Sequence, residues 1–313
     1  MQRVPLISCD ALEQLKDSID ARSFSGGDIH GFSVAPVNGC QVGVDDVEHR
    51  DEVSFLGAIT EDVALVSLTQ VHYKMGHLLD MKAITQKAHD VGALVMWDLS
   101  HSAGALPVAL NGCDVDFAVG CTYKYLNGGP GAPAYLFVAK RHQGKETQPL
   151  TGWWSHERPF AFEQDYQPKN NIGQFLSGTQ PIVSLAAVEV GVDMLLSADM
   201  DAIRQKSLAL GDTFIQLIKE HLSEYGFTLA TPVEPTERGS QISLCSENGY
   251  AIMQALIEAG VLGDFRAPDN MRFGLTPLYT RYTDLWDAVM KLKSIMENNT
   301  WKAERFKSVS EVT

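Results

Sequence analysis

Two short apolar runs, each passing into a polar segment, constrain the fold of this 313-residue chain more than any other feature. The first run, 93–97, leads into Asp98 and His101, and the second, 116–121, leads into the segment that contains Lys124. Runs of this length and composition are typical of buried strands. The carboxyl ends of neighbouring parallel strands meet at one edge of a sheet, where α/β proteins bind their ligands. The pattern therefore predicts that Asp98, His101 and Lys124 converge at such an edge.

An aspartate, a histidine and a lysine at one sheet edge suit pyridoxal phosphate. A lysine amine forms a Schiff base with the aldehyde of this cofactor. An aspartate holds a proton on its pyridine nitrogen, so that the ring acts as an electron sink. Taken singly, each residue has a simpler explanation, because a lysine after a strand is usually solvated and an aspartate there often caps a helix. The prediction depends on the longer sequence around Asp98 and Lys124.

The segments before Asp98 and Lys124 alternate between patterns typical of strands and of helices. Val63–Leu68 is predicted to be a buried strand, Asp80 to cap a helix that runs to about Val91, and Gly92 to end it before the next strand. This alternation predicts an α/β fold whose large domain has a mainly parallel sheet.

The second half of the chain predicts two long helices and then a smaller α+β domain. Residues 182–196 are apolar almost all round, which indicates a helix buried in the core or at a subunit interface. A more charged helix is expected from Asp199 to about His221. Further strands are expected at 227–230 and 241–245, and further helices at 250–259 and 283–298. We expect a divergent or truncated segment at 1–50, in which only 10–21 looks helical, a cofactor-binding large domain at 51–200, and a small domain at 201–313.

Composition excludes several classes of function. A net charge of −14 argues against non-specific nucleic-acid binding. No apolar stretch is long enough to span a bilayer, and the first residues show no signal-peptide pattern. The five cysteines are scattered without a Cys-x-x-Cys pair, which is typical of reduced thiols and predicts a cytoplasmic protein. His72, His77 and His89 have no ligand-like spacing, so we expect them at the surface and expect no metal site.

Several ordered segments of the chain resemble the kynureninase family. They are Leu68-Thr-Gln-Val-His-Tyr73, Trp97-Asp-Leu-Ser-His-Ser-Ala-Gly-Ala105, Asp116-Phe-Ala-Val-Gly-Cys-Thr-Tyr-Lys-Tyr-Leu-Asn-Gly-Gly-Pro-Gly131, Leu150-Thr-Gly-Trp-Trp-Ser-His156, Phe175-Leu-Ser-Gly-Thr-Gln-Pro181, Gly263-Asp-Phe-Arg-Ala-Pro268 and Met271-Arg-Phe-Gly-Leu-Thr-Pro-Leu-Tyr279. The resemblance covers roughly residues 50 to 300. It implies a fold-type-I pyridoxal-phosphate enzyme that cleaves L-kynurenine, or 3-hydroxykynurenine, to anthranilate or 3-hydroxyanthranilate and L-alanine, in tryptophan catabolism and NAD precursor synthesis.

The resemblance also implies a role for individual residues. Lys124 would be the Schiff-base lysine and the proton shuttle, Asp98 the partner of the pyridine nitrogen, and His101 a neighbour of the ring that supports Asp98. Tyr123 and Thr69 would hydrogen-bond the cofactor phosphate, and Tyr123 is also a candidate acid. Trp153 and Thr179 would reach the phosphate of the neighbouring subunit in a homodimer. Arg272 would bind the substrate carboxylate. On their own, Thr69 and Thr179 are ordinary strand and loop residues, and Trp153 suits a core or an interface equally well. A charged Arg272 in an apolar run needs a partner whatever its function.

The first fifty residues depart from the family pattern. Kynureninases carry a longer amino-terminal portion with a Gly-Asn-Ser-Leu-Gly segment, a Thr/Ser pair at the cofactor phosphate, and a Phe-Pro-Thr-Asp segment. None of these segments occurs here. Phe24-Ser-Gly-Gly-Asp28 differs from the Phe-Pro-Thr-Asp segment in spacing and lacks its proline. The sequence therefore leaves open a weakly active or inactive kynureninase homologue.

A cysteine desulfurase on the same fold is a less favoured alternative. Cys245 follows Lys124 at a distance that suits a thiol nucleophile, but the alternating pattern of 241–245 predicts a strand and not a mobile loop. In addition, desulfurases usually have a histidine where Tyr123 stands.

Overall fold

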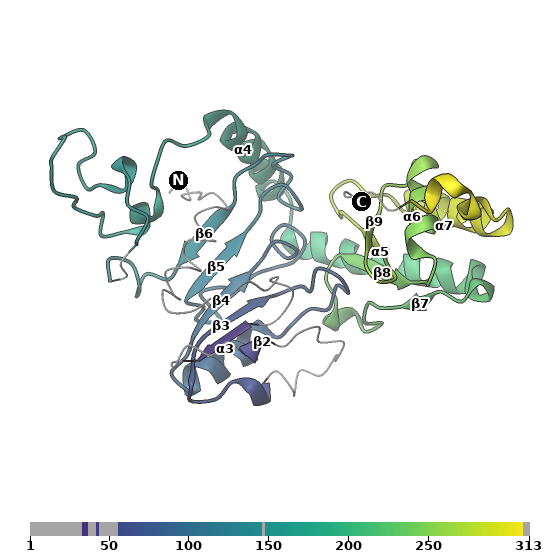
Figure 1. The fold of residues 1–313 in the computed structure, drawn as a ribbon, viewed down its shortest axis with the longest axis horizontal. Helices are drawn as coiled ribbons and strands as arrows, with labels where there is room; N and C mark the ends of the chain where they lie inside the picture. The colour runs from purple at the N-terminus through teal and green to yellow at the C-terminus, as the bar shows by residue number, and fades with distance from the viewer. Residues whose placement is uncertain (1–32, 37–41, 44–55, 146–147, 309–313) are drawn as a thin grey trace. The chain divides into compact units, whose positions relative to one another are not determined.

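The computed structural model describes residues 33–36, 42–43, 56–145 and 148–308, and these form two compact units (Figure 1). Unit 1 comprises most of the chain to Ser197, and unit 2 comprises residues 198–313 together with the segments Val71–Leu79 and Gly104–Pro107. The helix expected at 10–21 lies outside the described residues. No helix in the described part of the chain is both long and apolar enough to cross a bilayer.

Unit 1 is built on one six-stranded sheet with the order β2-β1-β3-β4-β5-β6. The strands are β1 (Ser33–Pro36), β2 (Val42–Gly43), β3 (Val63–Thr69), β4 (Leu94–Asp98), β5 (Phe117–Gly120) and β6 (Tyr135–Val138). The three central strands β3, β4 and β5 are parallel, whereas β1 and β6 join them in antiparallel fashion. The expected strands and their parallel pairing are confirmed at the centre of the sheet, while β6 was not predicted.

Helix α3 (Met81–Asp90) connects β3 to β4, as predicted. Asp80 caps it by accepting hydrogen bonds from the backbone N–H groups of Lys82 and Ala83. The helix packs on the sheet through Thr85, whose hydroxyl accepts a 3.1 Å hydrogen bond from the indole of Trp97. Because that indole is fully buried, its polar N–H needs this partner.

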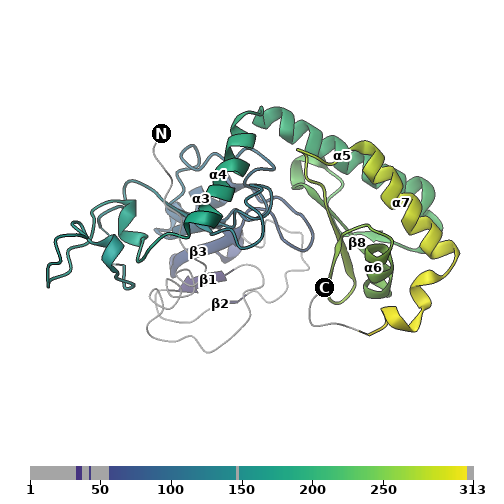
Figure 2. The same ribbon diagram turned by 90° about the horizontal axis from the view of Figure 1, so that it is seen from above.

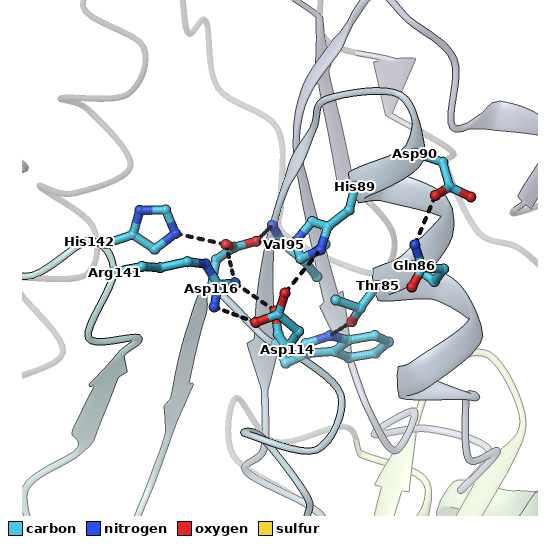
Figure 3. Close-up of polar contacts among 10 residues, drawn as sticks. Thr85, Gln86, His89, Asp90, Val95, Asp114, Asp116, Arg141 and His142 are labelled. Atoms are coloured by element: carbon cyan, nitrogen blue, oxygen red, sulfur yellow. Dashed lines mark hydrogen bonds and ion pairs between the residues drawn. The ribbon is translucent and has the colours of Figure 1, made fainter.

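A buried carboxylate ties four parts of unit 1 together at the edge of the sheet where β5 begins (Figure 3). Asp116 accepts hydrogen bonds from His89 of α3, the backbone N–H of Val95, and Arg141 and His142, which follow β6, at 2.6–2.8 Å. Burial by itself would raise the pKa of Asp116, but these hydrogen bonds outweigh it and hold the pKa below its ordinary value. The expectation that His89 is a surface residue is therefore wrong, because the ring is mostly buried against Asp116.

Helix α4 (Ile182–Leu196) was expected to be buried, and most of it is not. Only Val188, Gly191 and Leu195 are buried, while 88% of Val183 is exposed. The described residues therefore leave an apolar face of α4 uncovered. They do not bury the helix in a core, and its place at a subunit interface stays a prediction.

Unit 2 holds an antiparallel sheet of order β7-β8-β10-β9 and three helices. The elements are α5 (Met200–His221), β7 (Thr228–Leu229), β8 (Gln241–Cys245), α6 (Gly249–Glu258), β9 (Asp264–Arg266), β10 (Asn270–Gly274) and α7 (Tyr282–Glu297). Helices α5 and α7 run side by side (Figure 2), and one core joins them to β8, β10 and α6. The predicted helices and strands of this part are confirmed within one or two residues at most ends, and β9 and β10 are additions.

The segment Val71–Leu79 is anchored to the sheet of unit 2. The backbone carbonyls of Tyr73 and Met75 accept hydrogen bonds from Gln241 at 2.8 Å and Thr231 at 2.7 Å. Ser243 likewise donates to the carbonyl of Lys74 at 2.6 Å. Because these bonds are to backbone atoms, they position residue 73 whatever its side chain.

Candidate active site

The carboxyl ends of β3, β4 and β5 form one edge of the sheet in unit 1. Thr69 lies beside Asp98, and Asp98 lies beside Val119, in the parallel register. The pairing continues past the strands, because Gln70 donates to the carbonyl of Asp98 at 3.0 Å and Leu99 donates to that of Val119 at 2.8 Å. The sheet itself therefore positions Thr69 and Asp98 side by side.

Two loops that leave this edge bring Lys124 and His101 into contact. The amine Nζ of Lys124 lies 2.8 Å from Nε2 of His101, and both side chains are half-buried. An ammonium group has only donors, so a charged Lys124 requires Nε2 of His101 to be the acceptor and the imidazole to be neutral. The same amine lies 5.5 Å from the ring centroid of Tyr123, which is half exposed. The prediction that His101 and Lys124 converge is thus confirmed by a direct contact between the two side chains.

The loop that carries Lys124 closes on itself. The hydroxyl of the buried Thr122 donates to the carbonyl of Pro133 at 2.6 Å, and the carbonyl of Thr122 accepts from the N–H of Gly128 at 2.8 Å. Gly129 and Gly131 have φ values of 78° and 77°, in the left-handed region that favours glycine. The Gly-Gly-Pro-Gly run is therefore a tight turn that holds the backbone on both sides of Lys124.

Helix α4 supports this loop through backbone contact. A side chain at Gly191 would collide with the carbonyl oxygen of Leu126, and one at Gly128 would meet Val188 of the helix at 2.8 Å. The two glycines allow a closer approach than any larger residue would. Sequence reasoning found the glycines of the loop but not Gly191, which looks like an ordinary helix position.

The carboxylate of Asp98 is held from its own loop. Oδ1 accepts a 2.7 Å hydrogen bond from the N–H of Ser100, and the hydroxyl of Ser100 in turn accepts from the N–H of Cys121 at 3.2 Å. Two buried polar atoms beside this edge, Oε1 of Gln70 and Oγ of Ser102, have no hydrogen-bond partner among the described residues. Buried polar atoms are rarely left unsatisfied, so both mark a place where a ligand or water is expected. Sequence reasoning overlooked Gln70 and Ser102.

Trp153 and Thr179 lie elsewhere on the surface of unit 1. Trp153 begins the short helix η1 (Trp153–Ser155), is 46% exposed, and packs edge-on against Trp154 and Phe160 with ring centroids 4.8 and 5.8 Å apart. The loop around these rings lines a surface pocket of ≈ 410 Å³. Thr179 is exposed in the segment that leads to α4.

Arg272 lies in unit 2, on β10, and is almost buried. Its guanidinium forms an ion pair with Asp264 of β9 and donates to the carbonyl of Tyr73. The partner expected for a charge in this apolar run is therefore Asp264. Sequence reasoning had quoted the segment that contains Asp264 without giving that residue a role.

The comparisons with known proteins agree with the resemblance. Residues 203–292 match the family model described as the kynureninase C-terminal domain. The chain is 49% identical over 263 residues to a kynureninase of Burkholderia mallei (strain SAVP1), which covers 84% of this chain and 63% of the relative. It is 50% identical over 256 residues to a kynureninase of Pseudomonas fluorescens, covering 82% and 62%. The chain thus spans less than two thirds of the length of these curated relatives.

Solved structures identify the fold. The apo structure of a cysteine desulfurase from Thermococcus onnurineus NA1 superposes with a TM-score of 0.68 at 15% identity, over 79% of this chain and 63% of the other. An alanine–glyoxylate aminotransferase from Nostoc sp. gives 0.60 at 17% identity, over 79% and 65%. At such identities the likeness concerns the fold alone, and it confirms the predicted fold-type-I architecture. Over 84% of its length the chain is similar to curated kynureninases, and residues 203–292 match the model of the kynureninase C-terminal domain.

Proposed function

We propose that the chain acts as a pyridoxal-phosphate-dependent hydrolase that cleaves L-kynurenine, or 3-hydroxykynurenine, to anthranilate or 3-hydroxyanthranilate and L-alanine. The observation that carries the proposal is the placement of Lys124, His101 and Asp98 at one sheet edge, with the amine of Lys124 2.8 Å from His101. The identity of about half of the aligned residues to named kynureninases supports the same reaction. We also propose that residues 51–200 bind the cofactor, that residues 201–313 form the small domain, and that the protein is cytoplasmic.

The residues at the sheet edge fit the cofactor. Lys124 supplies the amine that its aldehyde requires. Oδ1 of Asp98 accepts only the bond from Ser100 among the described residues, so the carboxylate can accept a further proton donor. The unsatisfied atoms of Gln70 and Ser102 add polar groups beside this edge. A lysine, an aspartate and nearby hydroxyl groups are the donor set that this cofactor needs.

When bound, pyridoxal phosphate supplies an electron sink for the bond-breaking step. In this proposal Lys124 holds the cofactor and then moves a proton at the α-carbon of the substrate. Asp98 keeps a proton on the pyridine nitrogen, and His101 accepts a hydrogen bond from Lys124. Thr69 and Tyr123 hold the phosphate, and Tyr123 is the candidate acid.

Arg272 binds the substrate carboxylate in this proposal, because a guanidinium provides two parallel donors.

We further propose a homodimer in which Trp153 and Thr179 reach the phosphate of the neighbouring subunit. The uncovered apolar face of α4 supports this assembly, since Ile182, Val183, Val190 and Leu196 are 66–88% exposed within one chain. Contiguous exposed apolar surface of this kind is typical of protein–protein contacts. The exposed ring of Trp153 is likewise placed where a second chain could reach it.

Anthranilate fluorescence tests the proposed reaction. The protein is saturated with pyridoxal phosphate and mixed with L-kynurenine, beside an intact kynureninase such as that of Pseudomonas fluorescens. We expect anthranilate release that is abolished in Lys124→Ala, because the lysine amine is the group that forms the Schiff base. No release above the Lys124→Ala background would contradict the proposal.

A cysteine desulfurase is not favoured by the structure of unit 2. Cys245 is the last residue of β8, is paired with Asn270 and Thr228 on both sides, and is therefore held in the sheet. A persulfide-forming thiol is expected on a mobile loop, whereas Cys245 is held in the strand. L-Cysteine in place of L-kynurenine, with sulfide as the readout, provides the matching control.

A further inference from the structure

An aspartate and two arginines form a small charged group on the β9–β10 hairpin of unit 2. Asp264 lies directly opposite Arg272 in the antiparallel register. Its Oδ1 accepts from Nε of Arg272 at 2.9 Å, and its Oδ2 is in contact with Nη2 of the same guanidinium. Arg266, two residues further along β9, has its Nη2 3.4 Å from the same Oδ2. The side chain of Arg272 is only 12% exposed, so its orientation is set by these contacts.

The contacts of Arg272 leave one pair of donors for a ligand. A guanidinium has five N–H bonds, one on Nε and two on each Nη. Asp264 takes the bond on Nε and one on Nη2, and the backbone carbonyl of Tyr73 takes one on Nη1. One N–H on each Nη remains. If the carbonyl of Tyr73 takes the Nη1 hydrogen that points away from Nη2, these two N–H bonds are parallel, which is the arrangement that binds a carboxylate with two hydrogen bonds.

The charge of the group also favours an anion. Arg272 and Arg266 share one carboxylate, so the group carries a net charge of +1. Nε of Arg266 is buried and has no hydrogen-bond partner among the described residues. A lone Arg–Asp pair would be neutral and would gain little from a second carboxylate. The second arginine therefore preserves the attraction for an anionic ligand while Asp264 holds Arg272 in place.

We propose that Asp264 is a positioning residue, which fixes Arg272 so that its outer edge is presented to the carboxylate of an α-amino acid substrate. This inference rests on the proposed function and adds a residue that sets the affinity for the substrate carboxylate. Asp264 does not itself touch the substrate. Tyr73 contributes through its backbone carbonyl, which the hydrogen bonds of the segment Val71–Leu79 to unit 2 hold still.

The substitution Asp264→Asn separates positioning from charge, because the two would change the affinity for a carboxylate ligand in opposite directions. Removing the carboxylate raises the net charge of the group to +2. If charge alone governed binding, Asp264→Asn would bind a carboxylate more tightly. If Asp264 positions Arg272, the variant loses a charge-assisted partner and binds the carboxylate more weakly, by about tenfold for a loss of one such hydrogen bond.

The experiment uses the full chain loaded with pyridoxal phosphate. Binding of L-kynurenine and of the product L-alanine is followed by the change in cofactor absorbance, and KM and kcat by anthranilate release. For Asp264→Asn we expect dissociation constants and KM about tenfold higher, a kcat that changes by less than about threefold, and unchanged binding of kynuramine, the analogue of L-kynurenine without the carboxylate. Asp269→Asn removes the same charge from the same hairpin away from Arg272 and is expected to match the wild type.

Three results would overturn the inference. Wild-type affinity in Asp264→Asn, or tighter binding of L-alanine, refutes positioning while the proposed function stands. Equal weakening of kynuramine and L-kynurenine shows a general loss of structure in place of a carboxylate effect. A wild-type protein that holds the cofactor but responds to neither L-kynurenine nor L-alanine refutes the proposed function itself, and the inference with it.

Discussion

Lys124 and His101 come from loops after two different strands, yet the amine of one lies 2.8 Å from the imidazole of the other. The register of β4 and β5 produces this contact, because it aligns the points at which the two loops leave the sheet. The histidine therefore contacts Lys124 directly. The resemblance implies that His101 lies near the cofactor ring and supports Asp98, and that role stays a prediction.

Borohydride reduction of the cofactor-loaded protein is expected to attach pyridoxal phosphate to Lys124. Lys124 is half-buried and next to a proton acceptor, whereas Lys140, which follows β6, is exposed. Mass spectrometry of the peptides locates the label. Lys140→Ala is expected to keep the label and Lys124→Ala to lose it. Label on another lysine, or none in folded protein with excess cofactor, would count against the assignment of Lys124.

The apolar face of α4 predicts self-association. At micromolar concentration, sedimentation is expected to show a species near twice the mass of the 34.3 kDa chain. Val183→Asp is expected to convert it to a monomer, because the side chain is 88% exposed within one chain and a buried unpaired charge opposes association. Val233→Asp, at a valine that is 69% exposed in unit 2, serves as the control and is expected to leave the dimer intact. A wild-type monomer with the cofactor fully bound would contradict this prediction.

Asp116→Asn is expected to lower the free energy of unfolding by about 2 kcal/mol at pH 7, because the charged acceptor of several buried hydrogen bonds is lost. The folded pKa of Asp116 lies below that of the unfolded chain, which is about 3.9. Its stabilisation is therefore fully present above that value and disappears as the pH falls through the folded pKa. Chemical denaturation at pH 7 and at lower pH should show the deficit of the variant shrinking in acid.

Asp90→Asn provides the control for this experiment. Asp90 is exposed, follows His89 in α3, and among the described residues accepts only from Gln86. Its substitution is expected to change stability by no more than about 0.5 kcal/mol. An equal loss of unfolding free energy in both variants would show that the hydrogen bonds to Asp116 do not stabilise the fold more than those of a surface aspartate.

Gly191→Ala is expected to destabilise unit 1, although alanine normally favours a helix over glycine by about 1 kcal/mol. The added methyl group would collide with the carbonyl oxygen of Leu126 in the loop of Lys124. We expect a lower melting temperature and weaker cofactor binding. Gly57→Ala, at a helical position with open space around it, is the matched control and should neither lower the melting temperature nor weaken cofactor binding. A higher melting temperature in Gly191→Ala would show that the loop around Leu126 moves away from the added methyl group at little cost in free energy.

Local pattern was enough to predict most elements. Apolar runs identified β3, β4 and β5. Asp80 was correctly predicted as a helix cap, and the helix predicted to begin at Asp199 does begin there, with Asp199 as its cap. The same pattern did not reveal β6, β9 or β10. What makes these segments strands is pairing with residues that lie far away or across a turn, which periodicity does not record.

The sequence by itself determined the fold class and the sheet edge from which the loops of His101 and Lys124 leave, because neighbouring parallel strands end at the same edge of the sheet. Tertiary structure decided which polar groups pair. It assigned Asp264 to Arg272, His89 to Asp116 and His101 to Lys124, and it left the apolar face of α4 uncovered. The physical reason is that side-chain hydrogen bonds and burial depend on distances between segments far apart in the chain, and those distances are set only when the sheet and its loops are assembled.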